Sequence, residues 1–417
     1  MSNMKKLKHR ICLSLAMAGG ASLVMAQTSP SLDSLEKENK DLKARLDALE
    51  AMVKKEGLMN SGTPAPTAVK ALTETTISGF VAASFFHDFS TPAGGTSPGY
   101  LWNRKNDSFS LNKVKLTLAS PEVQPSGEKW DAGYRVSLIF GQDAPIVNTS
   151  SSTVGFSAIR EAYAEVNVPV GTGLDVKVGE LISLLNYESG DGGAANDNFS
   201  QGFQWFFTGN PPSAGVQASY NFTDWLGIKA RVQNGLYAGP VDNNSSKTGL
   251  LAVDLKPCKD TWVRIVGFDG REDAFAQSVK GGSFLAGWQA TEKIHFGTEL
   301  DYFLFDNPDT AVPAGHSPVW STGLWAAYKF NKQYTLAVRG EYLDDKHGVD
   351  ASGGALGFAN APGVGQELSS VAITLSYWAT PALKIQPEIR YDHSDLANAF
   401  GHQNNRVTAG AGMTYLF

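Results

Sequence analysis

Apolar and polar side chains alternate along most of this chain, from Thr75 to the last residue. A period of two is the pattern of a β-strand with one apolar and one polar face. The segment 130–141 is the clearest case: one face carries Trp130, Ala132, Tyr134, Val136, Leu138 and Phe140, and the other carries Asp131, Gly133, Arg135 and Ser137. The segments 383–391 and 406–417 alternate in the same way. Segments of about ten residues with this pattern are typical of a transmembrane β-barrel.

Weaker segments of the same kind start near Ile77, Phe109, Ile159, Leu174, Gly215, Leu226, Thr248, Thr261, Ser283, Ile294, Ser321, Tyr334 and Glu367. Together they predict an all-β fold: an antiparallel transmembrane barrel of about sixteen strands, an even number as bacterial barrels require. We place this barrel at residues 74–417. Short links such as 169–173, 221–225 and 378–382 alternate with long ones, among them 186–213, 269–282, 306–319 and 343–366. Short periplasmic turns and longer external loops are expected of an outer-membrane barrel.

Aromatic residues gather beside the short links: Tyr220, Phe222, Trp225, Trp262, Trp288, Tyr328, Phe330, Tyr334, Tyr377, Trp378, Tyr415 and Phe417. Amphipathic rings are favoured between lipid and water. The cluster therefore predicts an aromatic girdle at the periplasmic end of the barrel. Scattered core aromatics are the alternative.

The composition excludes other classes of protein. The chain has 417 residues, of which 18% are charged, with a formal net charge of −6 and a pI near 5.7. It lacks the basic footprint of a nucleic-acid-binding protein. After the first 26 residues, no stretch has the roughly 18 uninterrupted apolar residues of a spanning helix, which excludes a helical transporter.

Residues 1–26 have the pattern of a secretory signal peptide. A basic segment with Lys5, Lys6, Lys8 and Arg10 precedes an apolar run and ends at Ala26, where we expect cleavage. Removing four cations and no acids changes the formal charge from −6 to −10. Cys12 leaves with the signal, so the mature chain keeps a single thiol, Cys258, and no disulfide framework.

Residues 27–56 predict a short periplasmic coiled-coil helix, and residues 57–73 a linker. Heptad positions a and d are occupied by Leu32, Leu35, Asn39, Leu42, Leu46, Leu49 and Val53. Charges of opposite sign flank this seam, and one Asn at an a position commonly fixes the register of a parallel assembly. We expect a homo-oligomer held by this stem. A solvated spacer helix is the alternative, because about three heptads are marginal alone.

Several further motifs together resemble a known family. They are Ile77-Ser78-Gly79-Phe80, Gly133-Tyr134-Arg135-Val136, Phe140-Gly141-Gln142-Asp143-Ala144, Glu161-Ala162-Tyr163, Val178-Gly179-Glu180, the loop from Tyr187-Glu188 to Asn198-Phe199-Ser200, and Tyr415-Leu416-Phe417. In these the chain resembles the outer-membrane beta-barrel porin-2 family, the OmpL-like porins. The resemblance implies a pore in the outer membrane, reached through the periplasm. Tyr415 and Phe417 resemble the signal read by the barrel-assembly machinery.

A barrel of about sixteen strands is too wide for side chains to fill its interior, so an aqueous channel is expected. The predicted lumen face carries bases (Lys115, Arg135, Lys177, Lys229, Arg231, Arg264, Lys329, Arg339, Lys384, Arg390, Arg406) and acids (Asp131, Glu161, Glu165, Asp175, Asp254, Glu299, Asp301, Glu341, Glu388). Neither sign prevails. We expect small hydrophilic solutes and ions to diffuse passively through this channel, while outer-membrane lipid surrounds the barrel.

The long link 186–213 contains Glu188, Asp191 and Asp197 and no Lys or Arg. In position it is similar to the inward-folded constriction loop of general porins, whose acids face a basic wall. The candidates for that wall are Lys113, Lys115 and Arg135, on the early strands. An external solvated loop and a weak cation site built from its carboxylates are the alternatives.

Enzymatic readings find little support. Residues 95–99 match G-x-S-x-G but lack the strand and helix of a nucleophile elbow. The histidines are dispersed, without zinc spacing, and no phosphate-binding loop occurs, so we expect no enzyme, cofactor or metal. Three classes remain: a diffusion porin, a substrate-selective porin, and a structural or adhesive barrel that joins envelope layers through its coiled coil. Porin analogy favours a trimer.

Overall fold

The computed structural model describes Lys40 and residues 74–417, apart from 103, 149–156, 240, 243, 273–276 and 308–313. The predicted signal peptide, coiled coil and linker, including heptad residues Leu32 to Val53, lie outside the described residues. Residues from Glu74 to Phe417 form a compact unit of their own. No helix in the described part of the chain is long and apolar enough to span a membrane.

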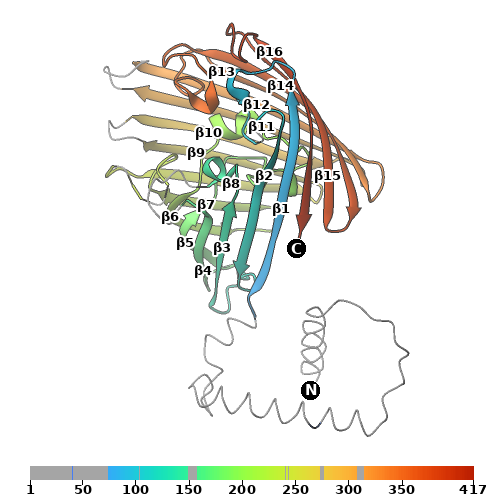
Figure 1. Ribbon diagram of the computed structural model, residues 1–417. Helices are drawn as coiled ribbons and strands as arrows, with labels where there is room; N and C mark the ends of the chain where they lie inside the picture. The colour runs from blue at the N-terminus through green and yellow to red at the C-terminus, as the bar shows by residue number, and fades with distance from the viewer. Residues whose placement is uncertain are drawn as a thin grey trace, which may run out of the picture. The chain divides into compact units, whose positions relative to one another are not determined.

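Sixteen antiparallel strands form one closed barrel, in which each strand pairs with its neighbours in sequence and β1 pairs with β16 (Figure 1). The strands are β1 (Thr76–Asp88), β2 (Ser108–Ala119), β3 (Asp131–Phe140), β4 (Ile159–Val168), β5 (Leu174–Leu181), β6 (Ser213–Asn221), β7 (Leu226–Gln233), β8 (Thr248–Cys258), β9 (Thr261–Arg271), β10 (Ser278–Gln289), β11 (Ile294–Asn307), β12 (Gly315–Lys329), β13 (Tyr334–Asp345), β14 (Gln366–Thr380), β15 (Leu383–Ser394) and β16 (Asn405–Leu416). The predicted all-β barrel is confirmed.

The two faces of the barrel invert the usual burial of side chains. On β14, for example, Val371 and Ile373 are exposed, whereas Ser370 and Thr374 are buried. Outward apolar residues and inward polar residues are expected where lipid surrounds the barrel and the lumen is polar. The sequence alternation therefore reports directly which side chains face lipid.

The last residue closes the barrel. The backbone N–H of Gly79 donates to the Phe417 carbonyl at 2.9 Å, and the N–H of Phe417 donates back to Gly79 at 3.0 Å. Tyr415 pairs with Val81 in the β1–β16 register, and the side chains of Tyr415 and Phe417 are exposed. Both aromatics of the predicted insertion signal thus lie on the lipid-facing surface at the closing seam.

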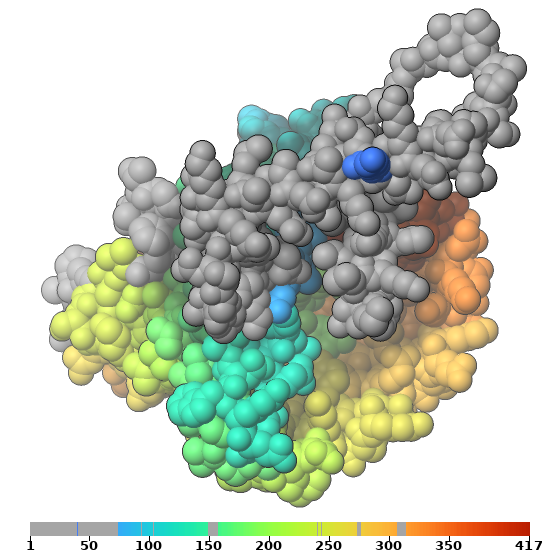
Figure 2. Space-filling view, turned by 90° about the horizontal axis from the view of Figure 1, so that it is seen from below, coloured from blue at the N-terminus to red at the C-terminus, as the bar shows by residue number. Residues whose placement is uncertain are grey.

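At the short-turn end, where β1 starts, the strand ends lie within three residues of the predicted short links. The first connection there, residues 120–130, is longer than the others and folds onto the neighbouring β4–β5 turn, because Asn167 donates to the Ser126 carbonyl at 2.9 Å and to the Lys129 carbonyl at 2.8 Å. Figure 2 views the barrel from this end, where the β2–β3 connection belongs to the turquoise surface.

The predicted aromatic girdle needs one correction. Most of its members are exposed at this end, for example Trp225, Trp288 and Phe330. Trp262 and Trp378 instead face the lumen: the Trp262 ring stacks on Tyr187, with 5.8 Å between centroids, and Lys384 Nζ lies 5.5 Å from the Trp378 ring. The period of two places Trp262 on the same face of β9 as Arg264, and Trp378 on the same face of β14 as the buried Ser376 and Thr374.

The external ends of β9 to β12 also differ from the prediction. The segments 269–282 and 306–319 were predicted as long loops, yet β9 continues to Arg271, β10 starts at Ser278, and β12 starts at Gly315. Here the lumenal side chains are apolar and buried, among them Val279, Phe303 and Val319. The outward side chains of these extensions are polar, for example Arg271, Lys280 and His316, so the apolar-outward alternation of a lipid-facing strand is missing there and the sequence pattern ends too early.

The external end of the barrel is packed with loop side chains. Trp102, Val147, Phe203, Phe358 and Phe400 come from separate connections and form one buried apolar cluster. Beneath this cluster, Arg390 and Arg406 lie under aromatic rings of the same connections. Cation–π contacts of this kind stabilise desolvated guanidinium groups. The arginine centres are 5.0 and 5.1 Å from the Tyr100 ring.

Candidate pore constriction

The β5–β6 connection, residues 182–212, is called loop L3 below. It contains the short helices η2 (Gly192–Ala194) and α5 (Phe203–Phe207). Its residues contact lumenal side chains of β2 and of β11 to β16, which lie on different sides of the barrel. Loop L3 therefore crosses the lumen, and Figure 1 shows helix α5 within the ring of strands.

Carboxylates of the barrel wall hold the backbone of loop L3. Glu388 on β15 accepts the backbone N–H of Phe199 at 2.8 Å and that of Ser200 at 3.2 Å. Glu299 on β11 accepts the N–H of Tyr187 at 2.9 Å. A buried carboxylate that accepts backbone N–H groups forms charge-assisted hydrogen bonds, which are about twice as strong as neutral ones.

Wall cations hold the loop carbonyls in the same way. Lys384 donates to the Gly193 and Asn196 carbonyls at 2.9 and 2.8 Å. Arg390 donates to the Gln201 carbonyl at 2.7 Å, and Arg339 donates to that of Ser200 at 2.5 Å. These contacts use the loop backbone, so the wall residues contribute directly to the fold of L3.

Two close approaches fix aromatic residues of the loop against wall glycines. A Cβ atom at Gly412 would lie 1.9 Å from Phe199 Cε2, and one at Gly297 would lie 2.1 Å from the Tyr187 ring. The Tyr187 ring also stacks on Trp325, with 4.5 Å between ring centroids. Only glycine leaves room for these rings to reach the wall.

The three acids predicted for the constriction lie on loop L3 and have three different partners. Glu188 is buried and bonds Arg339 at 3.0 Å and the Trp325 indole N–H at 3.1 Å. Asp191 pairs with Lys115 at 2.6 Å. Asp197 pairs with His295 at 2.6 Å, and its side chain is 42% exposed.

Of the three predicted bases, the structure brings Lys115 to a loop acid. Lys113 instead pairs with Asp143 at 3.1 Å and lies 3.5 Å from the centroid of the Trp102 ring. Arg135 pairs with Glu161, its wall neighbour, at 2.5 Å, and its side chain is 38% exposed. Two of these three bases are thus engaged elsewhere than on loop L3.

The wall opposite the anchored part of L3 stays partly exposed. On β5, β7 and β9 the side chains of Lys177, Lys229 and Arg264 are between 22% and 28% exposed. They pair with wall acids: Lys177 bonds Glu165 at 3.2 Å, and Asp254 bonds both Lys229 and Arg264. A cavity of about 420 Å³ lies along these residues.

The alternation of the strands predicted that Arg339, Glu299 and Glu388 face the lumen, but it did not predict that they contact loop L3. Their contacts depend on how L3 folds, and the alternation of a strand carries no signal for that. His295 was missed entirely as a partner of Asp197. No group of three or more His, Cys, Asp or Glu side chains in the described part of the chain could hold a metal ion.

A closed sixteen-stranded barrel with an apolar exterior, a charged lumen and an inward-folded third external loop defines an outer-membrane porin. The chain belongs to a family described as putative beta-barrel porin-2, OmpL-like, whose model matches residues 74–417. It is thus a porin channel of the outer membrane, as the sequence motifs indicated. A comparison with curated protein sequences gives no match.

Solved porins share the fold at low sequence identity. The anion-selective porin from Comamonas acidovorans is 10% identical, with a TM-score of 0.55 over 82% of this chain and 99% of that one. The outer-membrane channel DcaP of Acinetobacter baumannii is 12% identical, with a TM-score of 0.54 over 82% of this chain and 97% of that one. OprB of Pseudomonas putida is 11% identical, with a TM-score of 0.54 over 84% and 96%.

Proposed function

We propose that this porin is a passive diffusion channel for small hydrophilic solutes, and that loop L3 forms its constriction. The observation that carries the proposal is the course of L3 across the lumen. The loop is fixed there by wall carboxylates on its N–H groups and wall cations on its carbonyls. A loop anchored through its backbone narrows the lumen permanently. It does not have to open for each solute that passes.

The charges on loop L3 that water can reach are the ones that act on solutes. Asp197 is 42% exposed and Asp191 is 21% exposed, whereas Glu188 is 3% exposed. Arg135, at 38%, is an exposed base on the wall. Acids on the loop and bases on the wall produce a transverse field, which orients dipolar solutes and favours small polar molecules over apolar ones.

Ion selectivity tests this constriction. The double variant Asp191→Asn with Asp197→Asn removes two negative charges from the pore, so the reversal potential in a salt gradient is expected to shift toward anion permeation. Asp224→Asn is the matched control, because Asp224 is exposed in a periplasmic turn away from the loop. An unchanged reversal potential and conductance in the double variant contradict the constriction.

Glu188→Gln serves a different purpose in the same experiment. Glu188 is buried between Arg339 and Trp325, so it anchors the loop and contributes little to the field in the water-filled part. Its neutralisation is expected to increase current noise, through a looser loop, with a smaller shift in reversal potential than the double variant gives.

The assembly of the porin is a second part of the proposal. We expect a homo-oligomer, a trimer by porin analogy, held by the heptads of residues 27–56. Deleting residues 27–60 after the signal and measuring the mass of the detergent-solubilised protein tests the stem. An unchanged oligomer assigns association to the barrel wall instead, and residues 27–56 then act as a spacer.

A further inference from the structure

A cavity of about 380 Å³ lies among the external loops. Residues from five different connections line it, among them Arg104, Ile146, Trp205, Tyr237 and Leu356. The volume is near the lower end of the range of about 300–1,000 Å³ found for small-molecule sites. The cavity therefore suits a compact solute at the outer entrance, on the side of L3 that carries helix α5.

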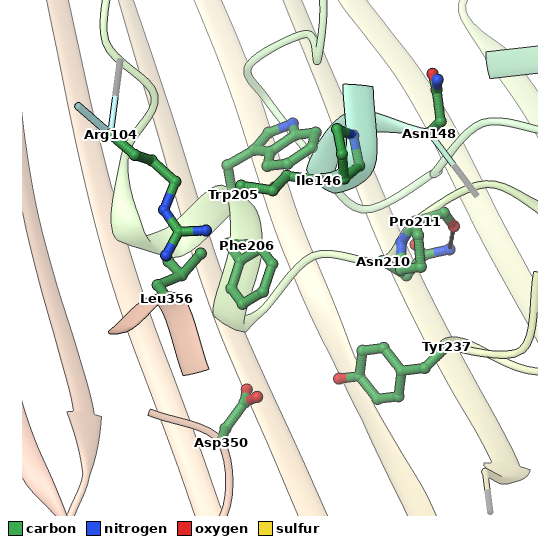
Figure 3. A pocket seen from close by; sticks show the side chains of 11 residues that line it. Arg104, Ile146, Asn148, Trp205, Phe206, Asn210, Pro211, Tyr237, Asp350 and Leu356 are labelled. Carbon is green, nitrogen blue, oxygen red and sulfur yellow. Dashed lines mark hydrogen bonds between the residues drawn. The ribbon is translucent and has the colours of Figure 1, made fainter. Parts of the chain in front are cut away.

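The walls of the cavity are largely apolar and aromatic. Ile146, Trp205, Phe206, Pro211 and Leu356 line it, and Figure 3 shows the rings of Trp205 and Phe206 facing the space between the loops. An apolar wall with a few placed polar groups is typical of sites that hold a solute by its body and orient it by its ends.

Three polar atoms at this cavity lack hydrogen-bond partners in the part of the chain that the structure describes. Arg104 Nε, Asn148 Oδ1 and Asp350 Oδ2 are buried and make no hydrogen bond with the described residues. Asn148 is only 1% exposed. A buried polar atom without a partner costs free energy, and a ligand that supplies the partner recovers it.

Arg104 and Asp350, a base and an acid, both line the cavity. In the view of Figure 3, Leu356 and Phe206 lie between the Arg104 guanidinium and the Asp350 carboxylate. We propose that this cavity binds short zwitterionic peptides with apolar side chains, the carboxylate at Arg104 and the ammonium at Asp350, before they enter the channel. The guanidinium matches a carboxylate because its Nε and Nη groups form a planar fork.

The proposed ligand must place its two charged ends on either side of Leu356 and Phe206, as Arg104 and Asp350 lie in Figure 3. In a free amino acid the ammonium and the carboxylate share one carbon atom, whereas a dipeptide places a peptide unit between them. The apolar side chains of the peptide then face Trp205 and Phe206, where aromatic contacts add to burial. A peptide with charged side chains is disfavoured, because the wall would desolvate those charges without compensation.

This inference deepens the proposed function and rests on it for the fate of the solute, but binding is measured separately from transport. The purified full chain in detergent is titrated calorimetrically with leucyl-phenylalanine, with its N-acetylated form and with its C-terminal amide. Saturable binding of the free dipeptide is expected, with at least tenfold weaker binding of each blocked form.

Two variants test which residue binds which end of the dipeptide. In Arg104→Gln, binding of the dipeptide weakens about tenfold and amidation has no further effect, whereas acetylation still does. In Asp350→Asn the pattern reverses. Lys105→Gln, an exposed cation next in sequence to Arg104, and Asp306→Asn, on the rim of β11, are matched controls and are expected to bind as the wild type does.

The proposal is overturned if the wild-type porin does not bind the dipeptide, or binds all three forms equally. The comparison of blocked ligands on the wild type decides this even if a variant fails to fold. No binding together with normal conductance overturns the cavity proposal alone. An unchanged reversal potential after removal of the loop acids overturns the constriction alone, so the two failures are distinguishable.

Discussion

The anchoring of loop L3 by Glu388 gives the sharpest prediction of the structure. The Glu388 carboxylate is 6% exposed and accepts the N–H groups of Phe199 and Ser200 and the hydroxyl of Thr374, the last at 2.5 Å. Each hydrogen bond to a charged group contributes about 1.5–3 kcal/mol. Because such bonds are not additive, we expect Glu388→Ala to cost the anchored loop about 3–5 kcal/mol in total.

The lost free energy weakens the attachment of loop L3 to the wall. The barrel itself is unaffected, because its strand hydrogen bonds stay intact. This loss raises the equilibrium constant for local detachment of L3 roughly 10²-fold or more, since every 1.4 kcal/mol is a factor of ten. Loop L3 contains no Lys or Arg but has several aromatic residues, so chymotrypsin is the suitable probe. Cleavage after Phe199 in the folded porin is expected to accelerate by a similar factor.

Two further variants complete the experiment. Glu388→Gln keeps one oxygen acceptor and is expected to give an intermediate cleavage rate. Glu367→Ala is the matched control, because this acid lies at the exposed end of β14 and bonds Tyr342 and Lys346, far from the loop backbone. If Glu388→Ala is cleaved no faster than the wild type or Glu367→Ala, the loop is not held by Glu388 and the reasoning fails.

Three other perturbations have defined outcomes. Gly412→Val places side-chain atoms where the Phe199 ring lies, so single-channel conductance is expected to change with the displaced loop, whereas Gly249→Val, where the added Cβ would meet nothing within 4 Å, leaves it unchanged. Burial and the Asp345 carboxylate raise the pKa of Asp350 well above its ordinary value. The ionised form is therefore destabilising, and Asp350→Asn is expected to slow proteolysis of residues 346–365 several-fold at pH 8 and not at pH 3, below the ordinary Asp pKa of about 3.9; equal effects at both pH values contradict this. Deleting Phe417 removes both backbone hydrogen bonds with Gly79 and an exposed ring, so the amount of heat-modifiable, folded barrel in outer membranes is expected to drop several-fold on immunoblots. Deletion with no loss of assembled barrel contradicts a role of Phe417 in insertion.

Strand positions were predictable because lipid on one side and water on the other impose a period of two on each strand. Val371 and Ile373 against Ser370 and Thr374 show that rule. It failed at β10 and β12, where Val279 and Val319 turn apolar side chains to a packed lumen. At these ends, polar side chains such as Lys280 and His316 face outward and apolar ones face the lumen, so the pattern no longer matches that of a lipid-facing strand.

The site was less predictable than the fold, since the contacts of L3 depend on tertiary structure. Asp191 pairs with Lys115, a predicted wall base. Glu188 instead pairs with Arg339 and Asp197 with His295, on strands distant in sequence. Spacing along the chain carries no information on which wall residues a crossing loop touches. The glycines that admit Phe199 and Tyr187 are recognisable only once the rings are placed against them.

The central claim is an open channel narrowed by an anchored loop, and single-channel recording of the refolded full chain in a planar bilayer tests it most directly. The account predicts stable conductance steps, with a reversal potential in a salt gradient that shifts toward anions when Asp191 and Asp197 are neutralised. Correctly folded protein that gives no conductance steps contradicts it, and the alternative of a plugged structural barrel then takes its place.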